Sequence, residues 1–256
     1  MTRGPMRKVA LVTGGGRGIG REIALALGRE GCAVAVAART PDEVAATADE
    51  LRRLGVEAAA LDLDVSDADA IARVAGAVTT ALGPVEILVN NAGLAESAPF
   101  AKTDGALWDR HLRINATGPY LLSRALLPAM LASGWGRVIN IASVAGLRGA
   151  PYVTAYTASK HALVGLTRAL AAEVAGKGVT VNAICPGFAA TELTWRSARN
   201  IAAKTGKSFD DAVAALARLN PGGRLIEPAE VAGVAVKLLH DDATNGEAIV
   251  LDGTPS

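Results

Sequence analysis

Three side chains that can handle a proton stand close together in the middle of the chain. Tyr156 and Lys160 are four residues apart in an alanine- and leucine-rich segment, so a helix there places both on one face. A lysine ammonium beside a phenol favours the phenolate, and we expect Lys160 to lower the pKa of Tyr156. Tyr156 would then exchange a proton with a substrate oxygen near neutral pH. Ser143, shortly before them, offers a hydroxyl that can hydrogen-bond the same oxygen.

A glycine-rich turn is the second feature with chemical meaning. It lies between a short apolar run, residues 9–13, and a segment of helical period. Glycines in such a turn permit a tight bend and close approach of the backbone to a pyrophosphate, and the helix N-terminus attracts phosphate. Because the turn follows a strand and opens a helix, it predicts a nucleotide site. The residues expected there are Gly14, Gly16, Arg17, Gly18, Ile19 and Gly20.

The end of the second predicted strand bears on which nucleotide binds. An acidic residue there accepts hydrogen bonds from a ribose 2′-hydroxyl and marks NAD, whereas an arginine accommodates a 2′-phosphate. Arg39 stands at this position, and no carboxylate comes before Asp42. Arg17 supplies a second guanidinium and Thr40 a further hydroxyl donor. The pattern predicts NADP(H) in preference to NAD(H).

Strands and helices alternate along the chain in a way that would position these groups. β-Branched runs predict strands over residues 9–13, 33–37, 56–61, 85–89, 138–141, 179–183 and 248–251. Helices are predicted through about residue 28 and over 40–54, 66–82, 107–131, 155–175 and 228–240, with the fourth bent near Asn115. This alternation predicts an α/β Rossmann fold, a doubly wound and mostly parallel seven-stranded sheet with helices on both faces. A (β/α)8 barrel is the rival fold, and the glycine turn argues against it.

Composition and charge narrow the class of protein. Of 256 residues, 50% are hydrophobic and only 4% aromatic, which predicts a sizeable core built from Ala, Val, Leu and Ile. The 26 basic and 25 acidic residues argue against a nucleic-acid surface. No apolar run approaches the roughly 20 residues of a membrane span, and we expect a cytoplasmic protein. Residues 1–7 are expected to form a flexible tail and residues 8–256 a single domain.

The cysteines and histidines do not predict a metal site. Cys32 and Cys185 lack the spacing of metal ligands, and we expect two buried thiols. His111, His161 and His240 share no spacing that suggests coordination, and we expect them to be structural or solvated.

In their order along the chain, these motifs resemble the short-chain dehydrogenase/reductase family. The resemblance covers nearly the whole chain and rests on TGxxxGIG at the first turn, Asn90-Asn-Ala-Gly93, Ser143, Tyr156-x-x-x-Lys160 and Pro186-Gly187. Segments 136–143 and 179–187 are most similar to the 3-oxoacyl and polyketide ketoreductases. The resemblance implies hydride exchange between a nicotinamide cofactor and a carbonyl or alcohol substrate.

The resemblance also implies roles for single residues. Asn115 would be a fourth catalytic residue beside Ser143, Tyr156 and Lys160, holding a water that links Lys160 to solvent. Ala189 stands where the family usually has a β-branched residue, which implies a looser contact with the carboxamide. The implied cofactor contacts beyond the glycine turn and Arg39 are Asp64, Val65, Asn91, Ala92, Gly93, Tyr156, Lys160, Pro186, Gly187 and Thr191.

Reduction of a ketone, on a 3-oxoacyl thioester or a related substrate, is the favoured hypothesis. Few basic residues flank the expected cleft, with Lys177 the main candidate, so carrier-bound, CoA-bound and free substrates stay open. One alternative is an alcohol or hydroxysteroid-type dehydrogenase that works oxidatively. Another is a catalytically silent NADP sensor, although such proteins typically lack the Tyr or Lys. Residues from about 190 to 220, with Trp195 and Phe209, are predicted to form an irregular substrate lid.

Two predicted helices, 115–131 and 155–175, are apolar over more than one face, whereas a helix that covers a sheet needs a single apolar stripe. The surplus predicts burial against another copy, and the resemblance implies a four-helix bundle. We expect a homotetramer acting on a small molecule, with no nucleic-acid or membrane partner. The residues that carry this prediction are Leu121, Leu122, Leu126, Leu163, Leu166 and Leu170.

Overall fold

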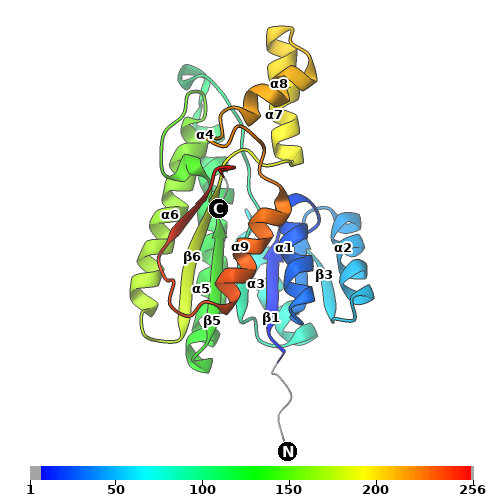
Figure 1. The fold of residues 1–256 in the computed structure, drawn as a ribbon. Helices are drawn as coiled ribbons and strands as arrows, with labels where there is room; N and C mark the ends of the chain where they lie inside the picture. The colour runs from blue at the N-terminus through cyan, green and yellow to red at the C-terminus, as the bar shows by residue number, and fades with distance from the viewer. Residues whose placement is uncertain (1–6, 255–256) are drawn as a thin grey trace, which may run out of the picture.

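The computed structural model describes residues 7–254, and in it seven parallel strands form one sheet (Figure 1). The strand order is β3-β2-β1-β4-β5-β6-β7, so the direction of winding reverses between β1 and β4. Ligands of such sheets bind at the carboxyl ends of the strands near this reversal. The predicted Rossmann fold is confirmed. The strands are β1 (Val9–Thr13), β2 (Ala33–Ala38), β3 (Ala58–Asp62), β4 (Ile87–Asn90), β5 (Gly136–Ile141), β6 (Val179–Pro186) and β7 (Ala248–Leu251).

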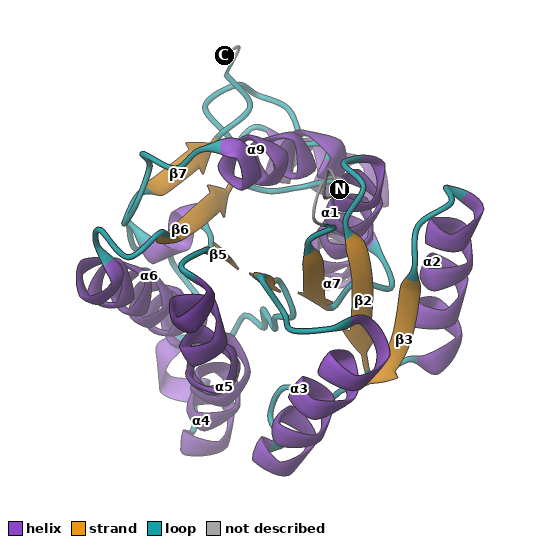
Figure 2. Ribbon diagram, turned by 90° about the horizontal axis from the view of Figure 1, so that it is seen from below, coloured by secondary structure: helices purple, strands orange, loops and turns teal. Residues whose placement is uncertain are grey.

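Helices cover both faces of the sheet (Figure 2). One face carries α1 (Gly18–Arg29), α2 (Pro41–Arg53) and α9 (Pro228–His240). The other carries α3 (Ala68–Leu82), α5 (Gly118–Ser133) and α6 (Thr154–Val174), with α4 (Gly105–Leu112) packed against α6. Helices α7 (Glu192–Thr205) and α8 (Phe209–Ala217) lie beyond the carboxyl ends of the strands, at the top of Figure 1.

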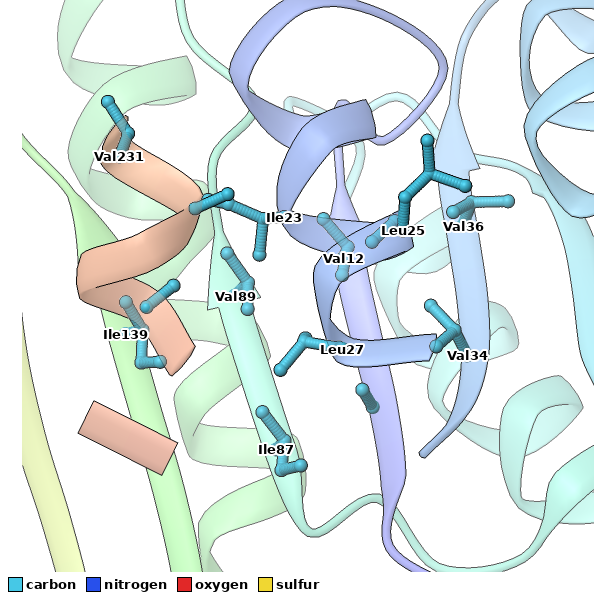
Figure 3. Packing of buried hydrophobic residues seen from close by; sticks show 14 of the residues in the cluster. Val12, Ile23, Leu25, Leu27, Val34, Val36, Ile87, Val89, Ile139 and Val231 are labelled. Atoms are coloured by element: carbon cyan, nitrogen blue, oxygen red, sulfur yellow. The ribbon is translucent and has the colours of Figure 1, made fainter. Parts of the chain in front are cut away.

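The core has two layers, one on each side of the sheet, because strand residues alternate in direction. In β2, Val34 and Val36 face the layer that includes Ile23 of α1 (Figure 3). Ala33 and Ala35 face the opposite layer. Both faces of the strand are buried, as is usual in parallel sheets. The aliphatic core predicted from the composition is confirmed.

Two local predictions differ from the structure. Residues 190–220 are not irregular, because α7 and α8 pair through Ala198, Ala212 and Leu216, which are buried between them. The helix predicted to start at residue 66 begins at Ala68, since Asp67 caps it while the Ser66 hydroxyl bonds Asp64. The bend near Asn115 is confirmed as a π-helical turn, Arg113–Thr117, that joins α4 to α5.

The predicted N-terminal tail falls mostly on residues 1–6, which lie outside the described part of the chain. Arg7 forms an ion pair with Glu57 and donates to the Leu82 carbonyl. Between residues 7 and 254, no helix has the length and apolar character needed to cross a membrane.

Candidate active site

The glycine turn lies between β1 and α1 at the carboxyl end of the sheet. Gly14 and Gly18 adopt positive φ angles of 63° and 53°, which L side chains rarely adopt. A Cβ at Gly20 would lie 2.3 Å from both the Gly14 carbonyl and Asn91 Nδ2, so only glycine lets α1 approach the turn this closely. Arg17, the N-cap of α1, makes no side-chain cap bond, and the first turn of the helix holds no acidic residue. The backbone N–H groups at the N-terminus of α1 are therefore left without a side-chain cap, and they suit a phosphate.

Residues from two other elements border this turn. The side chain of Thr191, the N-cap of α7, lies 3.4 Å from where a Cβ at Gly18 would be. Glu43 of α2 packs against Gly16, and Ile19 packs against the core. The turn, α2 and the start of α7 thus meet at one place, and the cofactor contact of Thr191 stays a prediction.

Basic side chains stand on the β2 side of the turn. Arg39 is exposed directly after β2, and Thr40 is the N-cap of α2 without a side-chain cap bond. Arg17 forms an ion pair with Glu43 at 3.2 Å, a contact that the sequence did not predict. A phosphate at this position would therefore share Arg17 with a carboxylate of the protein itself.

Asp64 and Val65 follow β3 and are fixed in place. Asp64 Oδ1 accepts hydrogen bonds from the Ser66 amide at 2.8 Å and the Ser66 hydroxyl at 2.7 Å. Burial raises the pKa of Asp64, but the bonds from Ser66 and the charge of Arg39 outweigh it, so that the pKa is lowered overall. The Val65 carbonyl would lie 2.6 Å from a Cβ at Gly118, which seats this segment on α5.

The segment after β4 connects the glycine turn to the proton-handling groups. Asn91 Nδ2 donates to the carbonyls of Thr13 and Gly14 at 2.9 and 3.1 Å. The amides of Asn91 and Ala92 both donate to the Thr13 hydroxyl, at 3.0 and 3.1 Å. Thr13, the first residue of the TGxxxGIG motif, is thus a junction between the two segments, a role for which the motif gave no sign. A Cβ at Gly93 would lie 3.6 Å from Lys160 Nζ, so this segment reaches the next group of residues.

Ser143, Tyr156 and Lys160 come together as predicted. Ser143 follows β5, and its Oγ accepts from the Ala145 amide at 3.1 Å. Lys160 of α6 is 5% exposed, and its Nζ donates to the Ile141 carbonyl at 2.8 Å. The same Nζ lies 5.9 Å from the centroid of the Tyr156 ring.

The electrostatics of this group differ from the prediction. Burial raises the pKa of Tyr156 above its ordinary value, and a hydrogen bond with Ser143 opposes this only in part. Burial also lowers the pKa of Lys160 to about 8. The predicted lowering of the Tyr156 pKa by Lys160 is therefore wrong for this structure, because desolvation disfavours the charged form of both groups.

Asn115 lies in the π-helical turn and is fully buried. Its Oδ1 accepts from the Leu94 amide, and its Nδ2 donates to the Leu94 carbonyl, both at 2.8 Å. Nδ2 also lies 2.9 Å from Ser159 Oγ, which in turn donates to the Tyr156 carbonyl at 2.7 Å. Asn115 therefore braces the segment after Gly93 against α6, and its role in holding a water stays a prediction.

The segment after β6 is held by a residue that no motif indicated. Pro186 ends β6, and the Gly187 amide donates to the Leu251 carbonyl at 2.8 Å. Asn220, 3% exposed, pairs with both backbone groups of Phe188 at 2.9 Å and donates to the Arg224 carbonyl. A lone asparagine after a helix carries no sequence signal for this role.

The remaining predicted residues divide between the core and the surface. Cys32 and Cys185 are buried thiols, as predicted. His111 is buried, whereas His161 and His240 are exposed. In the part of the chain that the structure describes, no three His, Cys, Asp or Glu side chains are grouped to hold a metal ion.

Half of the leucines expected at a subunit interface are already buried by the chain itself. Leu122, Leu126 and Leu163 are buried in the chain's own core. Leu121, Leu166 and Leu170 are half-buried against the same core. The prediction is therefore wrong for Leu122, Leu126 and Leu163, which this chain buries itself, and stays a prediction for the partly exposed Leu121, Leu166 and Leu170. The exposed positions of the two helices include the small residues Ala125, Ala129, Gly165 and Ala169.

Comparisons with known proteins show which sequences and folds this chain is similar to. The family model described as short chain dehydrogenase matches residues 8–202. The chain is 43% identical over 187 residues to a 3-oxoacyl-[acyl-carrier-protein] reductase of Pseudomonas aeruginosa, covering 73% of this chain and 76% of that protein. It is 40% identical over 238 residues to an acetoacetyl-CoA reductase of Rhizobium meliloti, covering 93% of each. A variant of actinorhodin polyketide ketoreductase, solved with NADPH, superposes with a TM-score of 0.92 at 38% identity, covering 96% of each chain.

Proposed function

Because this chain belongs to the short-chain dehydrogenase family, we propose that it is an NADPH-dependent reductase that converts a ketone into a secondary alcohol. One observation carries the proposal. Ser143, Tyr156 and Lys160 are grouped beside Gly93. The hydroxyl of Thr13 bonds the segment before Gly93 to the glycine turn. The 3-oxoacyl and acetoacetyl-CoA reductases among the relatives support a 3-oxoacyl thioester as the substrate.

The residues fit this cofactor, because the N-terminus of α1 is uncapped and Arg39 stands where a 2′-phosphate would be recognised. When bound, NADPH supplies a hydride to the carbonyl carbon. Ser143 donates a hydrogen bond to the carbonyl oxygen and orients it. Tyr156 gives its proton to that oxygen as negative charge develops there. Burial raises the pKa of Tyr156, so the phenol carries its proton at neutral pH and can act as this donor.

Lys160 and Asn115 complete the proposed machinery. With a pKa near 8, Lys160 can exchange a proton close to neutral pH and resupply the site after each turnover. Asn115 holds the α6 segment that carries both Tyr156 and Lys160, and we retain the proposal that it also holds a water between Lys160 and solvent.

A ketone panel tests the function. Absorbance of NADPH is followed with 3-oxoacyl-CoA, carrier-bound and free ketones, in wild type, Tyr156→Phe and the control Tyr120→Phe on the exposed side of α5. Turnover should collapse only in Tyr156→Phe, while NADPH binding survives. Cofactor binding without turnover of any carbonyl would instead favour the silent sensor. Faster oxidation of alcohols than reduction of ketones would favour the dehydrogenase alternative.

Cofactor choice is tested at Arg39. We propose that Arg39, with Thr40 and Arg17, holds the 2′-phosphate through charge-assisted hydrogen bonds. Arg39→Asp should lower kcat/KM for NADPH and raise it for NADH, whereas Arg73→Asp on α3 should change neither. An unchanged preference in Arg39→Asp, or a wild type that prefers NADH, would show the assignment to be wrong.

We also propose that α7 and α8 act as a lid. Trp195 of α7 and Phe209 of α8 pack with ring centroids 6.3 Å apart, which ties the two helices into one unit. Cofactor and substrate together should protect residues 190–220 from proteases. Equal cleavage rates with and without them would contradict a lid.

Assembly into a homotetramer is the last part of the proposal. The exposed small residues of α5 and α6, such as Ala125, Ala129 and Gly165, allow close approach of helices from another copy. Light scattering at micromolar concentration should give four times the mass of one chain, and Gly165→Arg should lower that mass. A monomeric wild type would refute the proposal.

A further inference from the structure

His111 lies one helical turn before Asn115 and has no exposed surface. Its imidazole packs edge to face against the Tyr156 ring, with centroids 6.4 Å apart and planes inclined by 73°. The Glu96 amide donates to Nε2 at 3.1 Å, and Nδ1 lies 2.8 Å from the Leu107 carbonyl. Besides its own helix, the histidine therefore contacts the Tyr156 ring of α6 and the segment that contains Glu96.

These two hydrogen bonds allow one tautomer. A backbone amide can only donate, so Nε2 must be unprotonated, and Nδ1 must carry the proton that the Leu107 carbonyl accepts. Rotating the ring would break both hydrogen bonds, whose partners are partly buried, which is costly. The imidazole is thus held in one orientation against Tyr156.

The segment that His111 contacts is attached at three points. Asn115 pairs with both backbone groups of Leu94, and His111 accepts from Glu96. Farther along, the Ala98 amide donates to the Tyr152 carbonyl at 2.8 Å. Tyr152 has a φ of 66°, a strained conformation for a residue other than glycine, at the entry to α6. Residues 94–98 therefore run along the start of the helix that carries Tyr156.

We propose that His111 is a positioning residue for the reduction, acting through two separable contacts. Its ring fixes the phenol of Tyr156 relative to Ser143, and its Nε2 fixes segment 94–98, which is bonded at Ala98 to the entry of α6. The inference rests on the proposed function for its kinetic consequences, whereas the geometry itself can be read without turnover.

Two substitutions separate the contacts. His111→Gln keeps an oxygen that can accept from the Glu96 amide but removes the ring, so kcat should fall about tenfold while the KM for the ketone stays near wild type. His111→Phe keeps a ring but leaves the Glu96 amide unpaired, so the KM should rise several-fold with a smaller change in kcat. His161→Gln is the matched control, because that exposed imidazole also bonds the carbonyl four residues before it. It should leave both parameters unchanged.

A second measurement does not need turnover. The chain has three tyrosines, so Tyr120→Phe with Tyr152→Phe leaves Tyr156 as the sole source of tyrosinate absorbance. In that background His111→Gln should lower the apparent pKa of Tyr156, because water reaches the phenol, whereas His111→Phe should keep it raised. A background protein that reduces no ketone would defeat the proposed function, but this titration would still report on His111.

Three results would overturn the inference. One is the same kcat, KM and tyrosinate titration in both variants as in wild type. Another is an equal loss of NADPH affinity and kcat in both variants, which would indicate general unfolding of the site. The third needs no variant: imidazole ¹⁵N shifts of the wild type that show His111 protonated on Nε2 would contradict its contact with Glu96.

Discussion

Lys160 should make the stability of the cofactor-free protein depend on pH in a way that one substitution removes. Burial lowers its pKa from 10.5 to about 8. The unfolded chain therefore holds the lysine proton more tightly than the folded one. The cost of burying the charged ammonium is fully present below about pH 8, and it disappears as the pH rises toward the unfolded value.

The size of this effect follows from the pKa difference. A pKa lowered from 10.5 to about 8 corresponds to about 3 kcal/mol of unfolding free energy, of which about 2 kcal/mol should be regained between roughly pH 7.5 and 9.5. The buried thiols act in the opposite direction, since burial raises the pKa of Cys32 to about 11 and also raises that of Cys185. Because the folded state favours the neutral thiols, these two groups lower the stability as the pH rises above the ordinary thiol pKa of 9.0. Only a comparison with a variant that lacks Lys160 separates its effect from that of the thiols.

Urea unfolding of wild type, Lys160→Met and Lys177→Met at the two pH values provides that comparison. Between them, wild type should gain about 2 kcal/mol relative to Lys160→Met. Lys177→Met should follow wild type, because Lys177 is exposed. Parallel pH dependence in wild type and Lys160→Met would show that burial does not shift this lysine.

Three further substitutions test other parts of the structure. Arg137→Met should lower the unfolding free energy in urea by about 3 kcal/mol, because it leaves the buried carbonyls of Gly136 and Leu239 without their guanidinium. Loss of the exposed Asp242 carboxylate in Asp242→Asn should cost less than about 1 kcal/mol. Asn220→Ala should raise the Kd for NADPH about tenfold by fluorescence titration, since the segment after β6 loses its brace, and an unchanged Kd would contradict that role. Gly20→Ala should abolish NADPH binding, because its Cβ has no room beside the glycine turn, while Gly76→Ala, in open space on α3, should bind normally and gain about 0.5 kcal/mol.

Local pattern was enough to predict the fold and the central residues of the site. β-Branched runs alternating with helical segments predict a doubly wound sheet, because each period specifies one kind of element. Tyr156 and Lys160 could be paired from their spacing alone, since residues four apart share a helix face. Gly14, Gly18 and Gly20 could be assigned because a turn between strand and helix imposes backbone conformations that glycine satisfies.

The pKa directions, the ion pair of Arg17 and the long-range hydrogen bonds of the site were decided by the tertiary structure. They depend on contacts between residues far apart in the chain. The spacing of Tyr156 and Lys160 placed them together but predicted the wrong pKa direction for the phenol, because burial by other elements sets it. The sequence predicted a phosphate as the partner of Arg17, yet Glu43 from the next helix forms an ion pair with it. His111 and Asn220 have no motif around them, and the roles proposed for them rest on hydrogen bonds to distant backbone groups. Desolvation and long-range hydrogen bonds are properties of the folded arrangement, and a sequence pattern reports them only when the partners are neighbours in the chain.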